Sequence, residues 1–266
     1  MWISRLGRSL AARTAILAIL YFLTGKLGLL LAVPPGYATV IWPASGIAVG
    51  MLLVYGPRLW GGVLIGSFLL NLVNSEGVSL EGGVDGVKLL TALGIAVGST
   101  IQALVGRWLV VRFVGLPLAL NGVRSVLTLL GLSGPAACMI AASVGVGTLL
   151  ATGIISPSEV AGNWLTWWLG DVLGVLVFLP LALAAPGNPR PPTWRGRPLA
   201  KLSILTILVL IVPLVLTFYA WKITAENVYD QRRTEFAALA SESEDALRFR
   251  MTSYDYALLG AAGYYQ

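Results

Sequence analysis

The sequence predicts an all-α integral membrane protein: a bundle of about seven transmembrane helices, a short interfacial or re-entrant helix, and a long C-terminal extracytoplasmic helix. Charged residues make up only 11% of the chain and hydrophobic residues 57%. The mean hydropathy of +0.82 exceeds that of a soluble globular domain. The apolar runs are long and do not alternate with polar residues, as the strands of a transmembrane barrel would, so they favour helices.

The first apolar run covers residues 14–33 and contains one charged residue, Lys26. Three arginines precede it, so we expect residues 1–13 to form a cytoplasmic N-terminus. A cleaved signal peptide is disfavoured because the run is long, has no clear small-residue cleavage site and is followed directly by further apolar runs. The run is therefore interpreted as the first transmembrane helix.

Two uncharged runs follow, residues 39–55 and 59–73, separated by Gly56-Pro57-Arg58. Glycine and proline interrupt helices, so this pattern predicts a tight helical hairpin. The next loop, residues 74–85, contains acidic residues and no basic one, and the following run, residues 89–106, returns to two arginines. The positive-inside rule places the acidic loop outside and the arginines inside.

Residues 125–158 contain no charged residue. As a helix they would extend about 51 Å at ~1.5 Å per residue, whereas the hydrocarbon core is roughly 30 Å thick. This length is too great for one span and too small for two. The sequence around Gly131 and Pro135 suggests a short interfacial or re-entrant helix after Asn121, followed by a full span over residues 135–155.

Two further apolar runs, residues 160–185 and 202–221, enclose a proline-rich basic loop at residues 186–201. With seven crossings, all the arginine-rich loops lie in the cytoplasm, whereas an eighth crossing would move this loop outside. We therefore expect a transmembrane bundle over residues 14–185, a cytoplasmic loop, and a last transmembrane helix over residues 202–221. The remaining segment, residues 222–266, is rich in charge and is expected to be an extracytoplasmic amphipathic helix that continues the last span.

Composition excludes several functions. The chain has no histidine, which removes the phosphoacceptor of a histidine kinase, the commonest general base and the commonest transition-metal ligand. We therefore expect no enzymatic activity, no metal site and no cofactor in this chain. The single cysteine, Cys138, cannot form a disulfide within the chain and is expected to be a buried, inert thiol. The net charge of +6 comes mainly from residues that flank apolar runs, so lipid head groups are the expected partner and nucleic acid is not.

Two charged residues, Lys26 and Asp171, lie deep within predicted spans. A charged side chain at the bilayer centre costs about 2.5–3.5 kcal/mol if it is unpaired. Counted by helical rise, they lie at similar depths in the outer half of the membrane, so we expect them to pair. Polar and tryptophan side chains at the same depth could line a cavity for a small molecule, a lipid or a quinone. The alternative is a structural role, in which the lysine reaches the interface and the tryptophans anchor helices. The candidate ligand-binding residues are Lys26, Trp42, Asn71, Trp167, Trp168 and Asp171.

Two stretches match a known pattern: Gly-Tyr-Ala-Thr-Val-Ile-Trp-Pro-Ala-Ser-Gly-Ile-Ala from residue 36, and Trp-Trp-Leu-Gly-Asp-Val-Leu-Gly-Val-Leu-Val-Phe-Leu-Pro from residue 167. On the basis of these two stretches, residues 10–185 resemble the first class of bacterial membrane-associated sensor domains, the MASE family. The segment from Phe236 to Gly263 resembles the beginning of a CHASE extracellular sensory domain. About a fifth of such a domain is present, so residues 222–266 are expected to be a truncated piece of it.

The resemblance implies a sensory input module of a two-component or cyclic di-GMP signalling protein in the bacterial inner membrane. Related proteins are sensor histidine kinases and diguanylate cyclases, whose output domains lie in the cytoplasm. No such domain is present in this chain. The resemblance also implies a homodimer, because sensors of this type work in pairs, and an unknown small-molecule or lipid-like ligand. The alternatives are a small-molecule transporter or substrate-binding membrane subunit, and a passive membrane anchor.

Overall fold

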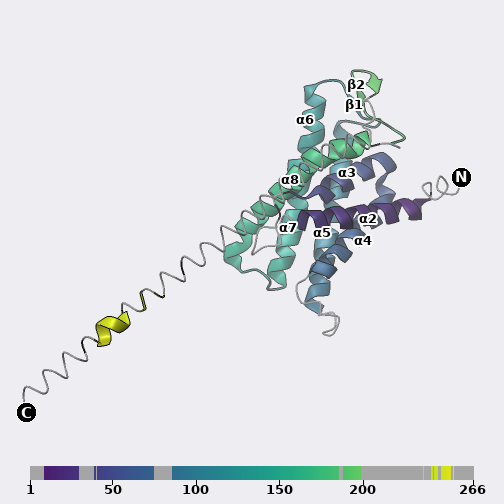
Figure 1. Ribbon diagram of the computed structural model, residues 1–266. Helices are drawn as coiled ribbons and strands as arrows, with labels where there is room; N and C mark the ends of the chain where they lie inside the picture. Colours follow the sequence, from purple (N-terminus) through teal and green to yellow (C-terminus); the bar gives the residue numbers. More distant parts are fainter. Residues whose placement is uncertain are drawn as a thin grey trace, which may run out of the picture. The chain divides into compact units, whose positions relative to one another are not determined.

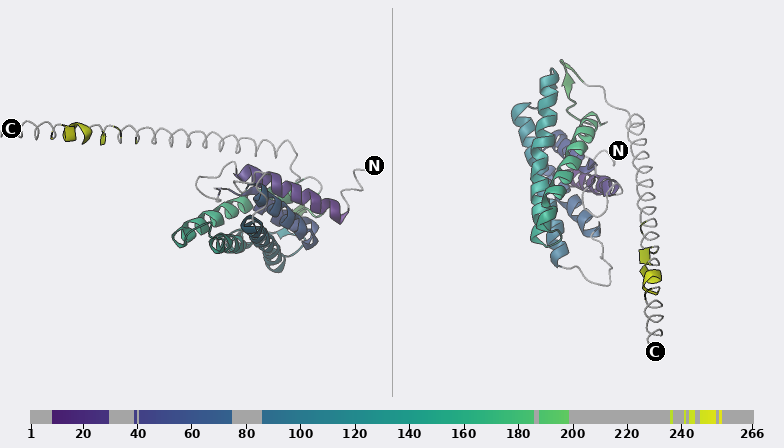
Figure 2. Two further views of the ribbon diagram at one scale, coloured as in Figure 1. Left: turned by 90° about the horizontal axis from the view of Figure 1, so that it is seen from below. Right: turned by 90° about the vertical axis from the view of Figure 1, so that its left-hand side faces the viewer.

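The computed structural model describes residues 9–29, 39, 41–74, 86–185 and 188–198, together with isolated positions between 236 and 254. The chain divides into two units, Met1–Val212 and Pro213–Gln266. The first unit is a helical bundle, seen from three directions in Figures 1 and 2. Its α-helices are α2 (Leu10–Leu29), α3 (Pro43–Tyr55), α4 (Trp60–Asn74), α5 (Gly86–Phe113), α6 (Val123–Gly131), α7 (Ala137–Ala151) and α8 (Val160–Ala184).

The membrane prediction is confirmed in its coarser form. Among the described residues, four continuous helical stretches are long and apolar enough to cross a membrane: Leu10–Leu29, Gly86–Phe113, Val123–Ala151 and Pro157–Ala184. Large apolar side chains also face outward from the bundle, such as Ile19 at 57% exposure and Leu90 at 59%. A surface of this kind suits lipid as the solvent. The predicted span at residues 202–221 lies outside the described residues.

The predicted turn between residues 55 and 60 forms, but α3 and α4 do not pack extensively against each other as a tight hairpin would, and α3 is shorter than its apolar run. Helix α3 begins at Pro43, which occupies the first helical position, where proline needs no backbone N–H. Before it, Thr39 belongs to an extended bridge and Trp42 is not helical. The turn after α3 uses Gly56, whose φ of 101° is accessible to glycine at little cost. A short 3₁₀ turn, Pro57–Leu59, then leads into α4.

The prediction that residues 125–158 divide into a separate short helix and a full span is wrong. Helix α6 continues through a five-residue π-helical turn, Leu132–Ala136, directly into α7. The wider π turn accommodates Pro135 without ending the helix, because its hydrogen-bond pattern tolerates the missing proline N–H. There is consequently no separate re-entrant helix after Asn121. The continuous stretch is about 43 Å long at ~1.5 Å per residue, so it exceeds the hydrocarbon core and must tilt or extend beyond it.

A three-stranded sheet, which the sequence did not predict, lies at one end of the bundle (Figure 1). Strand β1 (Ala119–Leu120) pairs in parallel with β2 (Thr193–Trp194), and β2 pairs antiparallel with β3 (Arg197–Pro198). Each strand has only two residues, below the usual length, so no period-two pattern was available in the sequence. The pairing brings the loop after α5 to the loop after α8.

Packing within the bundle joins mainly helices that are not consecutive in the chain. Helix α3 packs most extensively against α8, α4 packs against both α2 and α5, and α5 packs against α7. The core between these helices is aliphatic and includes the fully buried residues Leu17, Val49, Leu52, Leu70, Val175 and Leu179. The contact between α3 and α8 joins the two sequence stretches that carry the family resemblance.

Candidate functional site

The start of α3 is anchored directly to the backbone of α8. The Trp42 N–H donates to the Gly170 carbonyl oxygen at 2.9 Å. The Ser45 hydroxyl lies between two carbonyl oxygens, 2.8 Å from that of Trp42 and 2.9 Å from that of Asp171. These bonds satisfy polar groups of the non-helical chain before α3, as the membrane interior requires.

Glycines on both helices permit this close approach. A Cβ atom on Gly174 would overlap the Trp42 carbonyl oxygen, and one on Gly170 would overlap that of Thr39. On the opposite side, a Cβ on Gly46 would overlap the carbonyl oxygen of Gly174. Glycines four residues apart on each helix, Gly46 with Gly50 and Gly170 with Gly174, therefore serve a specific contact between α3 and α8.

Asp171 lies at the centre of this contact. Its side chain is 2% exposed, and one carboxyl oxygen, Oδ2, is fully buried with no hydrogen-bond partner among the described residues. The side chains of Trp167 and Ser45 lie beside the carboxyl group. Leaving a buried acceptor unsatisfied costs about 1–3 kcal/mol, so this oxygen is a strong acceptor for any donor that reaches it.

A polar seam runs from the start of α3 to helices α4 and α5. The Trp42 indole N–H donates to the Tyr21 hydroxyl at 3.4 Å. The hydroxyls of Ser67 and Ser99 lie 3.5 Å apart, close to the same tyrosine hydroxyl. Asn71 donates to the Ser67 carbonyl oxygen at 2.8 Å. Tyr21 and Ser67 are buried, so the seam is an internal polar path through an apolar bundle.

A second group of polar contacts links the site to the π turn. The Trp168 indole N–H donates to the Pro135 carbonyl oxygen at 2.9 Å. Gln102 donates to the Cys138 sulfur at 3.2 Å, and the Cys138 thiol lies 3.9 Å from the Ser133 carbonyl oxygen. Cys138 is buried and unoxidised. The carbonyl oxygens released by the altered helix geometry are thereby partly satisfied.

The predicted pair between Lys26 and Asp171 does not form. The Lys26 ammonium donates instead to the Asn74 side-chain oxygen at 2.5 Å, and it also lies 5.8 Å from the centre of the Phe22 ring. Helix α2 packs mainly against α4 and α3 rather than α8. The expectation rested on a similar depth counted by helical rise, and depth alone does not determine which neighbour a helix face meets.

The structure thus brings together four of the six predicted site residues. Trp42, Trp167, Trp168 and Asp171 surround the contact of α3 and α8, and the ring of Trp167 packs close to Gly145 of α7. Asn71 joins the polar seam, whereas Lys26 lies at the end of α2 beside Asn74.

Sequence reasoning missed several polar residues of the site, of which Gln102 had a recognisable signal as an amide within an apolar run. The isolated serines gave none, because a serine in a membrane helix can simply bond its own backbone. The missed residues are Tyr21, Ser45, Ser67, Ser99 and Gln102.

Comparison with known proteins gives one match. The family model MASE1 matches residues 13–229, which include both sequence stretches and the whole site. No curated protein and no solved structure matches the chain. The match ends before Phe236, so the resemblance of the later segment to a CHASE domain stays a prediction.

Proposed function

The chain belongs to the MASE1 family of membrane-associated sensor domains, and on that premise we propose that it is the sensory input module of a bacterial signalling protein in the inner membrane. It relays a stimulus from the membrane or the periplasm to a cytoplasmic output domain of the histidine kinase or diguanylate cyclase class. Like other sensors of this type, it acts as a homodimer.

The observation that carries the proposal is the buried Asp171 at the backbone contact of α3 and α8. A donor that reaches Oδ2 gains a strong hydrogen bond, and its binding is coupled to the spacing of two helices that touch through glycines. After α8, the chain passes through the β2–β3 hairpin and then reaches residues 202–221, the predicted last span. A small shift of α8 therefore has a direct route along the chain toward the following domain.

The proposed ligand site consists of a carboxyl group surrounded by aromatic side chains. Trp42, Trp167 and Trp168 offer apolar faces, and Asp171 and Tyr21 offer hydrogen-bonding groups. This combination suits a small molecule or lipid-like ligand that carries a hydrogen-bond donor.

The proposed topology has seven crossings, with the N-terminus cytoplasmic and the C-terminal segment periplasmic. The pairing of β1 with β2 supports it, because residues 120 and 193 can lie together only if the chain crosses an even number of times between them. Arg13 lies 4.9 Å from the Tyr55 ring centre, and Arg107 donates to the Leu52 carbonyl oxygen at 3.0 Å. These contacts place basic residues of α2 and α5 near the same end of α3, as the positive-inside rule requires.

The short helix α3 is compatible with a crossing. It is about 20 Å long at ~1.5 Å per residue, and the two non-helical residues before it, Ile41 and Trp42, add up to about 7 Å at ~3.3 Å per residue. Together they come close to the thickness of a hydrocarbon core of roughly 30 Å. The extended part is tolerated within the membrane because α8 supplies its hydrogen-bond partners.

The test is the signalling output of the full-length gene product with Asp171→Asn, which keeps the shape of the side chain and changes its charge and hydrogen bonding. We expect an output that no longer responds to the stimulus, or that is fixed high or low, at normal protein levels. Lys26→Met is the matched control, because it removes a half-buried charge outside the site and should leave the response intact. A normal response of the Asp171 variant, with the protein folded, would contradict the proposal.

Transport is the second candidate. Transporters place substrate at interrupted helices near the bilayer midplane, and α3 begins inside the bundle beside a buried carboxyl group. Purified protein in proteoliposomes distinguishes the two functions. Uptake of a ligand that is abolished by Asp171→Asn would favour transport, whereas binding without uptake is expected for a sensor.

A further inference from the structure

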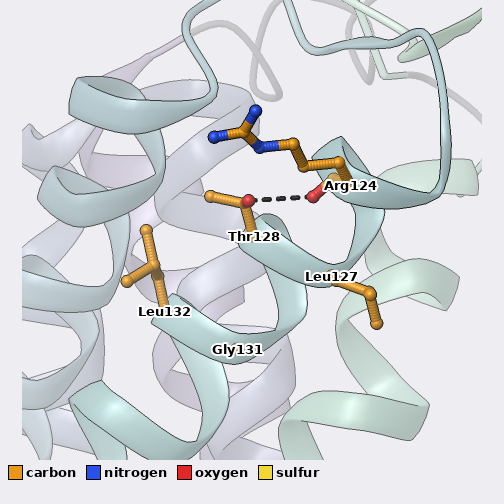
Figure 3. Close-up of a pocket in the computed structure, with 5 residues that line it drawn as sticks. All are labelled: Arg124, Leu127, Thr128, Gly131 and Leu132. Atoms are coloured by element: carbon orange, nitrogen blue, oxygen red, sulfur yellow. Dashed lines mark hydrogen bonds between the residues drawn. The ribbon is translucent and has the colours of Figure 1, made fainter.

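A groove on the outside of the bundle lies apart from the site described above. It has a volume of about 470 Å³ and is lined by Arg124, Leu127, Thr128, Gly131 and Leu132, all from α6 and the first residue of the π turn. Arg124 lies at its upper end and Leu132 further down the helix (Figure 3). The groove extends along about 12 Å of helix at ~1.5 Å per residue. Its walls are mainly apolar, with the arginine at one end.

The guanidinium at the end of the groove is not neutralised. Arg124 is exposed, and its guanidinium has no hydrogen bond or ion pair with any described residue. Only its carbonyl oxygen is engaged, as acceptor from the Thr128 hydroxyl at 2.8 Å. Among the described bundle residues only Glu159 and Asp171 are acidic, and both belong to α8 or the turn before it, away from the start of α6. The described residues therefore leave Arg124 without a counterion, and an anion that reaches its guanidinium gains a charge-assisted hydrogen bond.

The floor of the groove is open because residue 131 is glycine. A Cβ atom added there would have no neighbour within 4 Å. Val123 and Leu127, on the same helix, are 69% and 64% exposed, so α6 presents its apolar surface outward. A positive charge at one end and an apolar trough below it match the two parts of an anionic phospholipid.

We propose that this groove binds an anionic phospholipid, with its phosphate on Arg124 and an acyl chain along Leu127, Gly131 and Leu132. The end of the bundle to which α6 belongs is basic, since β1 precedes α6 and pairs with the hairpin that carries Arg195 and Arg197. Basic recesses beside transmembrane helices bind anionic head groups through this arrangement. The bound lipid fixes the position of α6 relative to the membrane surface.

Native mass spectrometry of the purified chain, titrated with phosphatidylglycerol or with phosphatidylcholine, tests the proposal. We expect the protein to bind phosphatidylglycerol in preference to phosphatidylcholine. Arg124→Gln should raise the dissociation constant for phosphatidylglycerol about fivefold, because one arginine near an anionic surface contributes about 1 kcal/mol of binding free energy. Arg112→Gln is the control: it removes an exposed arginine at the end of α5 and should leave the preference intact. Equal losses in the two variants would show a diffuse basic surface and would overturn the proposal.

Filling the groove tests its apolar half separately. Gly131→Leu should reduce phosphatidylglycerol binding without changing the thermal unfolding midpoint, because the new side chain enters open space. Gly147→Leu is a matched control, since that glycine lies on α7 and its Cβ would also have no neighbour within 4 Å. Unchanged binding in Gly131→Leu would overturn the proposal. Displacement of the lipid by soluble glycerophosphate would do so too, because it would identify a simple anion site.

Discussion

The half-buried Lys26 and the buried Asp171 are stabilised in different ways. Lys26 lies near the end of α2, where the Asn74 amide oxygen and the Phe22 ring both interact with its ammonium. Asp171 lies about 17 Å along α8 from Val160, at ~1.5 Å per residue, and its Oδ2 has no partner among the described residues. The lysine is therefore a structural element of the α2–α4 contact, and the aspartate is the residue whose environment can change on binding.

A double-mutant cycle checks this separation. Lys26→Met and Asp171→Asn should affect the free energy of unfolding additively, within about 0.5 kcal/mol, because the two residues share no partner. Lys26→Met and Asn74→Ala should instead be coupled, since each removes the same hydrogen bond. Unfolding in mixed micelles, followed by circular dichroism, measures both cycles. Coupling in the first cycle and none in the second would show that the lysine does pair with Asp171.

The residue types of the site were predictable, but their pairing was not. Buried charges and tryptophans within apolar runs indicated Trp42, Trp167, Trp168 and Asp171 from the sequence. The partner of Lys26 depends on the face that α2 turns toward α4, and this rotation is decided by side-chain packing over the whole helix. Neither helical rise nor charge pattern contains that information.

At the scale of helices, the α3–α8 contact depends on glycines that allow backbone to touch backbone. Gly174→Ala should destabilise the bundle by about 1–3 kcal/mol, because its methyl group would overlap the Trp42 carbonyl oxygen. Gly162→Ala, in the same helix, meets no atom within 4 Å and should leave stability unchanged or slightly raised. Thermal unfolding midpoints of the two variants make the comparison. Equal midpoints would mean that α3 and α8 can separate freely.

The π turn is a second specific element. Trp168→Phe removes the indole donor to the partly buried Pro135 carbonyl oxygen and should cost about 1 kcal/mol of unfolding free energy. Trp164→Phe is a matched control, because its indole bonds the exposed Ser143 hydroxyl and its ring stacks on the same Trp168 ring. Chemical denaturation should show the larger loss for Trp168→Phe. A larger loss of unfolding free energy for Trp164→Phe than for Trp168→Phe would show that the π turn does not contribute to the stable core.

Most helices were predictable because lipid imposes a simple rule on apolar length. The span over residues 160–185 corresponds to α8 at Val160–Ala184. The failures have a common cause, since the extended start of α3, the π turn and the two-residue strands are all stabilised by contacts between distant segments. Trp42 is held by Gly170, Pro135 by Trp168, and Thr193 by Leu118. Such contacts leave no periodic trace in the sequence.

At the scale of the whole bundle, the two ends differ chemically. The loops around β1 and β2 are basic, and the turn before α8 carries Glu159. By the positive-inside rule we expect this polarity to orient the bundle with its basic loops in the cytoplasm, and the proposed seven crossings would then leave the segment after residue 221 in the periplasm. In the proposed function, the stimulus is received between these two ends and is relayed along the chain toward the output domain.

Thiol labelling in intact cells with a membrane-impermeant maleimide tests that arrangement most directly. In a Cys138→Ala background, cysteines replace Ser158, Arg195 or Ser243 one at a time, all at exposed positions. We expect labelling of Ser158→Cys and Ser243→Cys from outside, and of Arg195→Cys only after the inner membrane is permeabilised. Labelling of Arg195→Cys from the same face as Ser158→Cys, or of Ser243→Cys only from the cytoplasm, would contradict the seven-crossing sensor.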